Sequence, residues 1–225
     1  MDFHVMTLFP EMILNGLNHS IIKRAMADNL ISINCINIRD FSGNKHNKVD
    51  DYPYGGGKGL VMTPEPIYNT YLSIKDNLPP DTPVIYLSPK GKRLTQEKSK
   101  ILSEKQAVVL LCGHYEGIDQ RVIDEIVTEE ISIGDYILTG GELGAMVIID
   151  SVARLVDGVL TEEAVTNESF NDNLLEHPHY TRPYEFLGRK VPDVLISGHH
   201  EKIEKYRKET ALELTKNRRP DLLNS

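Results

Sequence analysis

Short apolar runs alternate with longer amphipathic segments along this chain as far as Val156. The most apolar run, Ala107 to Cys112, contains no polar side chain, which is typical of a strand buried on both faces. Strand-like runs also cover Phe3 to Phe9, Ile31 to Ile38 and Val84 to Leu87, and helix-like segments separate them. Strands separated by helices are typical of a parallel sheet with helices packed against it. We therefore expect an α/β fold.

Two glycine-rich loops follow strand-like runs: CGHYEGID (Cys112 to Asp119) and SIGDYILTGGELGAM (Ser132 to Met146). Because glycine has no Cβ, such loops let backbone N–H and C=O groups approach a flat, polar ligand closely. Parallel sheets bind ligands at the carboxyl ends of their strands, where Ser88, Gly113 and residues Ser132 to Gly141 would cluster. Neither loop has the spacing of a dinucleotide-binding or triphosphate-binding motif. The loops therefore predict a different kind of ligand.

The composition is that of a globular protein, with 40% apolar and 26% charged residues. The longest uninterrupted apolar run is about a third of a membrane span, and the N-terminus lacks the basic region of a signal peptide. We therefore expect a cytoplasmic protein with no membrane contact. Cys35 and Cys112 lie in strand-like runs, which favours buried thiols over a disulfide or a metal site.

The charge is unevenly distributed along the chain. The net charge is −8, yet Arg182 to Arg219 contains ten Lys or Arg against six Asp or Glu, a local +4, so the remainder carries −12. This asymmetry is compatible with a basic face that meets a polyanion, and equally with a solvated helix. The preceding segment, Asp157 to Glu176, is acidic and rich in Asn, as in a linker or lid. One helix, His199 to Lys216, is expected after it.

Eight motifs occur in order along the whole chain: TLFPEM (7–12), DDYPYGGGKGLVM (50–62), YLSPKGK (86–92), GHYEGID (113–119), SIGDYILTGGEL (132–143), HPHYTRP (177–183), VPDVLISGHH (191–200) and NRRPDLL (217–223). Together they resemble one family, the bacterial tRNA (guanine-N1)-methyltransferases. The resemblance implies a SPOUT-type parallel sheet with a C-terminal trefoil knot, plus a small α-helical C-terminal domain. It also implies a methyltransferase domain over residues 1–160, a linker or lid over 161–175 that carries the catalytic Asp, and a tRNA-binding domain over 176–225.

The resemblance implies methylation of guanine N1 at position 37 of tRNA, beside the anticodon, with S-adenosylmethionine as methyl donor. It implies that Asp172 and Arg154 are the catalytic pair. It also implies Mg²⁺ as a second cofactor, although no carboxylate cluster in the sequence locates that ion. The residues implied to bind the methyl donor are Leu87, Ser88, Pro89, Gly113, Tyr115, Glu116, Gly117, Ser132, Ile133, Gly134, Asp135, Tyr136, Ile137, Leu138, Gly140 and Gly141.

The chain departs from the family pattern at four positions. His114 stands where arginine is common, which puts in doubt any contact that needs a fixed positive charge there. Asn173 replaces a typical glycine, a mild change because Asn tolerates positive φ. Gly144 and Lys58 each stand where proline is common.

The proposed chemistry needs both catalytic side chains. Guanine N1 carries a proton, and a free aspartate with a pKa near 3.9 is a weak base for it. Arg154 would stabilise the negative charge that develops on guanine O6, a contribution of roughly 3 kcal/mol. From the residues alone, a solvated acid in a polar loop is the favoured reading of Asp172, and only the resemblance makes it catalytic. Arg154 likewise reads as a helix-terminal arginine that complements the helix dipole.

The partners implied are the anticodon stem-loop of tRNA and a second copy of the chain, with the active site at the subunit interface. The segment Tyr54 to Gly59 is either a surface loop or a flap that meets tRNA. Four histidines in the C-terminal part lack zinc spacing and nearby cysteines, so we expect no zinc site. Two other functions stay open, namely methylation of another RNA position and RNA or adenosine binding without catalysis. The expected tRNA contacts are Lys58, Arg182, Arg189, Lys190, His199, His200, Arg218 and Arg219.

Overall fold

The computed structural model describes residues 1–161, 165 and 168–224. The chain divides into two compact units, Met1–Leu160 and Thr161–Ser225, which are described separately. Residues 162–164 and 166–167 of the expected linker lie outside the described residues. Within the described ranges, no helix is both long enough and apolar enough to cross a membrane.

A five-stranded sheet forms the centre of the first unit, and all of its strand pairs are parallel. The spatial order is β2-β1-β6-β5-β7, so the wholly apolar strand β6 occupies the middle. The α/β fold with a parallel sheet is therefore confirmed. The strands are β1 (Asp2–Thr7), β2 (Ser32–Asn37), β5 (Val84–Arg93), β6 (Ala107–Cys112) and β7 (Glu129–Ser132).

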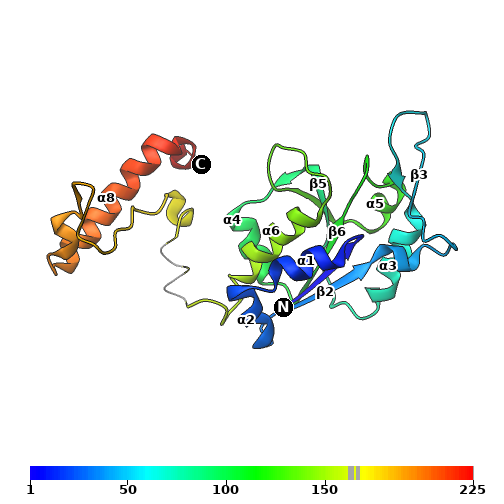
Figure 1. Cartoon of the computed structure of the whole chain (residues 1–225), viewed down its shortest axis with the longest axis horizontal. Helices are drawn as coiled ribbons and strands as arrows, with labels where there is room; N and C mark the ends of the chain where they lie inside the picture. Colours follow the sequence, from blue (N-terminus) through cyan, green and yellow to red (C-terminus); the bar gives the residue numbers. More distant parts are fainter. Residues whose placement is uncertain (162–164, 166–167, 225) are drawn as a thin grey trace. The chain divides into compact units, whose positions relative to one another are not determined.

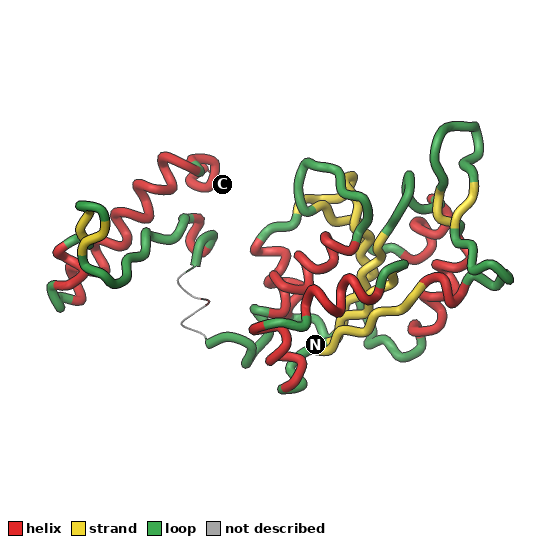
Figure 2. Tube along the Cα trace, in the orientation of Figure 1, coloured by secondary structure: helices red, strands yellow, loops and turns green. Residues whose placement is uncertain are grey.

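Helices cover both faces of this sheet (Figures 1 and 2). Side chains alternate along each strand, so Val108 and Leu110 of β6 join one core, and Val109 and Leu111 join the other. The first core includes side chains of α1 (Pro10–Leu17), α2 (Ser20–Ala27), α4 (Gln96–Ser103) and α6 (Glu142–Ala153). The second includes side chains of η1 (Ile38–Phe41), α3 (Pro64–Lys75) and α5 (Gln120–Ile126).

Strand β5 is interrupted at its carboxyl end. It pairs with β7 up to Leu87, and the pairing resumes only at Lys92. The residues between bulge out of the ladder, as is common beside binding sites. Gly91 comes so close to β7 that a Cβ there would lie 2.4 Å from the carbonyl carbon of Glu130. The sequence pattern predicted only Val84 to Leu87 of this strand because the bulged residues break the apolar run.

The second unit is built around helix α8 (His200–Arg218), which extends two residues beyond the predicted end. Its inner face buries Ala211 and Thr215. The hydroxyl of Thr215 accepts a hydrogen bond from the backbone N–H of Leu175, 2.9 Å away, and so fastens the entering chain to the helix. The shorter elements are η2 (Asn171–Asn173), β8 (Glu185–Phe186), β9 (Arg189–Lys190), η3 (Asp193–Ile196) and η4 (Pro220–Asn224).

Candidate active site

A pocket of about 280 Å³ lies at the carboxyl ends of β5, β6 and β7. The bulge of β5, the loop after β6 and the loop after β7 form its walls. The backbone N–H of Gly141 donates to the carbonyl of Gly113 at 3.0 Å, which holds the two glycine-rich loops together. The structure thus gathers the loops that the sequence indicated into one cavity.

Fifteen of the sixteen residues expected to bind a methyl donor line this pocket. The exception is Asp135, whose carboxylate instead forms an ion pair with Arg93 at 2.7 Å and is largely exposed. The residues in the wall are Leu87, Ser88, Pro89, Gly113, Tyr115, Glu116, Gly117, Ser132, Ile133, Gly134, Tyr136, Ile137, Leu138, Gly140 and Gly141.

Five further residues line the pocket that were not among the expected methyl-donor contacts: Tyr86, His114, Ile131, Thr139 and Gly144. Each lies in or directly beside a motif that the sequence analysis identified. This proximity to the motifs is the only feature of the sequence that could have indicated that these residues line the pocket.

A buried hydrogen-bond chain supports the pocket from behind. The carboxylate of Glu142, at the start of α6, is 1% exposed. It accepts a hydrogen bond from the hydroxyl of Thr7 at 2.6 Å and lies 2.7 Å from Nε2 of His114. The contact between Glu142 and Thr7 could not be predicted from the sequence, because the two residues are 135 positions apart and no spacing pattern links them.

Gly140 leaves space for this chain of contacts. A Cβ at Gly140 would lie 2.2 Å from Cε1 of His114 and 2.7 Å from Oε2 of Glu142. Such distances are far inside van der Waals contact, so no larger residue fits without displacing the imidazole. Glycine at this position therefore serves close packing.

Burial changes the acidity of three side chains in the first unit. It raises the pKa of Tyr86 to about 12, with a smaller contribution from the charge of Glu130. It also raises the pKa of Cys112, fully buried in β6, well above its ordinary value. Cys35 has a pKa of about 11 for the same reason. Cys35 was predicted to be buried, but it is only half-buried because β2 is an edge strand.

The triple-glycine segment forms the turn of a hairpin between β3 (Asp50–Asp51) and β4 (Val61–Met62). Its base is bonded to the pocket loop largely through backbone atoms, and the sulfur of Met62 also accepts a hydrogen bond from the N–H of His114. Glu116 N–H donates to the carbonyl of Leu60 at 3.0 Å, and Met62 N–H donates to that of Gly117 at 2.9 Å. The hairpin and the pocket wall are therefore mechanically joined.

The two expected catalytic residues lie in different units and do not line the pocket. Arg154 is the partly buried residue that caps the C-terminus of α6. Asp172 is exposed within η2 and has φ +51°. Asn173 has φ +58°, a conformation that Asn tolerates better than most residues.

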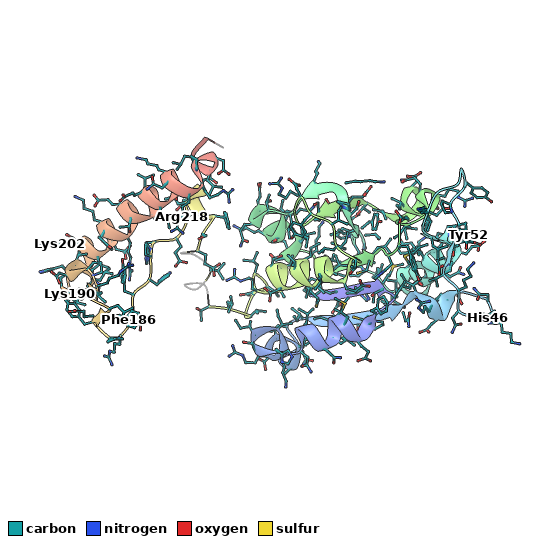
Figure 3. The ribbon with its side chains drawn as sticks, turned by 45° about the horizontal axis from the view of Figure 1, so that its top comes forward. His46, Tyr52, Phe186, Lys190, Lys202 and Arg218 are labelled. Atoms are coloured by element: carbon teal, nitrogen blue, oxygen red, sulfur yellow. The ribbon has the colours of Figure 1, made fainter. Side chains whose placement is uncertain are left out.

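The expected RNA contacts are solvent-exposed except Arg219, which is half-buried. Arg219 pairs with Asp221 at 2.6 Å and lies 5.9 Å from the ring centre of Phe170. Figure 3 shows Lys190 and Lys202 near the N-terminal end of α8, together with the exposed ring of Phe186, and Arg218 at the other end. Lys58 belongs to the hairpin of the first unit.

Comparison with known proteins identifies the family. The family model described as tRNA (Guanine-1)-methyltransferase TrmD matches residues 1–225. The chain belongs to this family. It is similar to curated proteins named tRNA (guanine-N(1)-)-methyltransferase from two organisms. These are Alkaliphilus oremlandii (61% identical over 99% of this chain and 92% of the relative) and Clostridioides difficile (58% over 99% and 97%).

In this member of the tRNA (guanine-1)-methyltransferase family, the two glycine-rich loops line the pocket together.

Proposed function

We propose that this protein transfers a methyl group from S-adenosylmethionine to N1 of guanine 37 in tRNA. The proposal rests chiefly on the family match over the full chain, together with the pocket formed by the same glycine-rich loops. S-adenosylmethionine supplies an electrophilic methyl group carried on a sulfonium. The protein must bind this donor, orient the guanine and remove the proton from N1.

The pocket residues fit such a donor chemically. A purine and a ribose need flat, narrow space bordered by main-chain donors and acceptors, and glycine provides it. The walls also contain the apolar side chains of Leu87 and Leu138, which can pack against a ring. The carboxylate of Glu116 is an acceptor suited to ribose hydroxyls.

In the proposed mechanism, Asp172 accepts the N1 proton and Arg154 stabilises the charge on guanine O6. The carboxylate alone is too weak a base, so the guanidinium supplies the remaining driving force. Because Asp172 belongs to the second unit and follows the linker, we propose that it serves the pocket of a partner subunit.

The surface of the first unit supports a dimer of this chain. On α6, Leu143 and Val147 lie one helical turn apart and are each 44% exposed, although they are large and apolar. The adjacent helix α1 contributes Met12, 43% exposed, and it packs against α6. An exposed apolar face of this kind marks a protein interface. We propose a second copy of the chain as its occupant, and the family's trefoil knot in the loops around the pocket.

One assay tests the proposed reaction. The protein is incubated with labelled S-adenosylmethionine and tRNA transcripts that carry guanine or adenine at position 37, and the product is mapped. Label on N1 of guanine 37 is expected. Label at another position would favour another RNA methyltransferase, and binding without transfer would favour a non-catalytic protein.

A subunit-mixing experiment tests the shared site. Asp172→Ala and Arg154→Ala should each lower kcat by about 10²-fold or more. In a mixed dimer one pocket would combine the intact Asp172 of one subunit with the intact Arg154 of the other, so activity should return. If the mixture stays inactive while both variants remain folded and dimeric, each pocket uses residues of one chain only.

A further inference from the structure

Three ligating side chains come together where the chain enters the second unit. The carboxylate of Glu176 and one ring nitrogen each of His177 and His179 lie within 4.8 Å of one another. Nε2 of His179 is 2.9 Å from Oε1 of Glu176, and the two imidazole centres are 4.9 Å apart. Among the residues that the structure describes, no other group of three such side chains comes this close. We infer that these three residues form a binding site for a divalent transition-metal ion, of which Zn²⁺ fits best.

The donor atoms decide which metal the site takes. Two imidazole nitrogens and one carboxylate oxygen are a ligand set that Zn²⁺ uses, with water in the fourth position. Mg²⁺ prefers oxygen ligands in octahedral geometry and is disfavoured here. Ligand atoms around a tetrahedral zinc ion are about 3.4 Å apart. The three ligand atoms lie within 4.8 Å of one another, and the side chain of His179 is 67% exposed, so it has room to turn towards an ion.

The neighbouring contacts already orient the cluster. Nδ1 of His177 lies 3.2 Å from the carbonyl oxygen of Pro178, which can only accept, so Nδ1 carries the proton and Nε2 is left for the metal. Metal-binding histidines commonly donate their second ring N–H to such a carbonyl. The backbone of Glu176 is fixed by a 3.0 Å hydrogen bond from its N–H to the hydroxyl of Ser169. Leu175 is fixed in turn to Thr215 of α8.

From the sequence no zinc site was expected at these histidines, because only the spacing of the histidines and the lack of a nearby cysteine were considered, and not the carboxylate of Glu176. The spacing His-x-His places two imidazoles on the same side of an extended segment. Glu176 completes the set. This inference goes beyond the proposed methyl transfer and does not rest on it.

Zinc titration of the full chain tests the site. The protein is treated with a chelator, dialysed, and titrated with Zn²⁺ by calorimetry, and with Co²⁺ while its visible absorption is followed. We expect one tight equivalent of Zn²⁺ per chain and the absorption typical of four-coordinate Co²⁺. His177→Gln and His179→Gln should each weaken Zn²⁺ binding by at least about tenfold. His46→Gln, an exposed histidine of the first unit, should leave the affinity unchanged.

Three results would overturn the inference. The wild-type chain could bind no stoichiometric Zn²⁺, the double variant H177Q/H179Q could bind it as tightly, or Mg²⁺ at similar concentration could displace it. Circular dichroism of each variant shows whether the fold is retained. Because the measurement needs neither S-adenosylmethionine nor RNA, its result is separate from that of the methyl-transfer assay.

Discussion

Replacing Thr7 by valine tests the buried hydrogen-bond chain behind the pocket. Valine keeps the shape of the side chain but removes the hydroxyl, which donates to the carboxylate of Glu142 at 2.6 Å and accepts from the backbone N–H of Phe9 at 2.9 Å. Glu142 is 1% exposed, so water does not easily replace the lost donor. A hydrogen bond to a charged group contributes about 1.5–3 kcal/mol to the free energy of unfolding. We expect a loss of about 2 kcal/mol, which corresponds to a Tm lower by roughly 4–8 °C.

The matched control is Thr70→Val. Thr70 is equally buried, but its hydroxyl donates to a neutral carbonyl, that of Pro66, within helix α3. Its loss should cost about 1 kcal/mol, or roughly 2–4 °C. The chain has no tryptophan, so thermal unfolding is followed by far-ultraviolet circular dichroism. If Thr7→Val lowers Tm no more than Thr70→Val does, the carboxylate does not depend on this donor and the reasoning fails.

Three further outcomes are expected. Gly140→Ala should destabilise the chain by about 1–3 kcal/mol and weaken S-adenosylmethionine binding, because the new Cβ displaces His114; unchanged calorimetric affinity would contradict this. Burial disfavours the Cys35 thiolate and raises the pKa of this thiol from 9.0 to about 11. In the Cys112→Ser protein, iodoacetamide at pH 8 should therefore modify Cys35 about a hundredfold more slowly than a free thiol, and the rate should rise as the pH approaches 11. A rate equal to that of a free thiol would refute the shift. Lys190→Ala should lower the salt dependence of tRNA affinity by about one counterion, and an identical slope would exclude a phosphate contact.

The sequence predicted the sheet well because strand burial leaves a direct pattern. Ala107 to Cys112 is apolar at every position since β6 lies between two neighbours and two helical layers. The edge strand β2 has a mixed sequence, and there the prediction of a buried Cys35 was too strong. Which strand is buried could be predicted from its apolar sequence, but the order of the strands in the sheet could not.

The pocket was predictable to the extent that it consists of main chain. Glycine-rich loops after adjacent strands indicate where a ligand lies, whatever its identity. The contacts of Glu142 and the ion pair that takes Asp135 out of the pocket wall depend on side chains brought together from distant positions. No local pattern encodes such long-range pairs.

The backbone bonds between the hairpin and the pocket loop have an evolutionary consequence. Leu60 and Met62 are held to Glu116 and Gly117 by main-chain atoms, which every amino acid except proline can supply in full. Mutation can therefore exchange the side chains at the hairpin tip, such as Tyr54, without dismantling the cavity behind them. Substitutions at this tip can therefore change what it contacts while the main-chain bonds at its base stay the same.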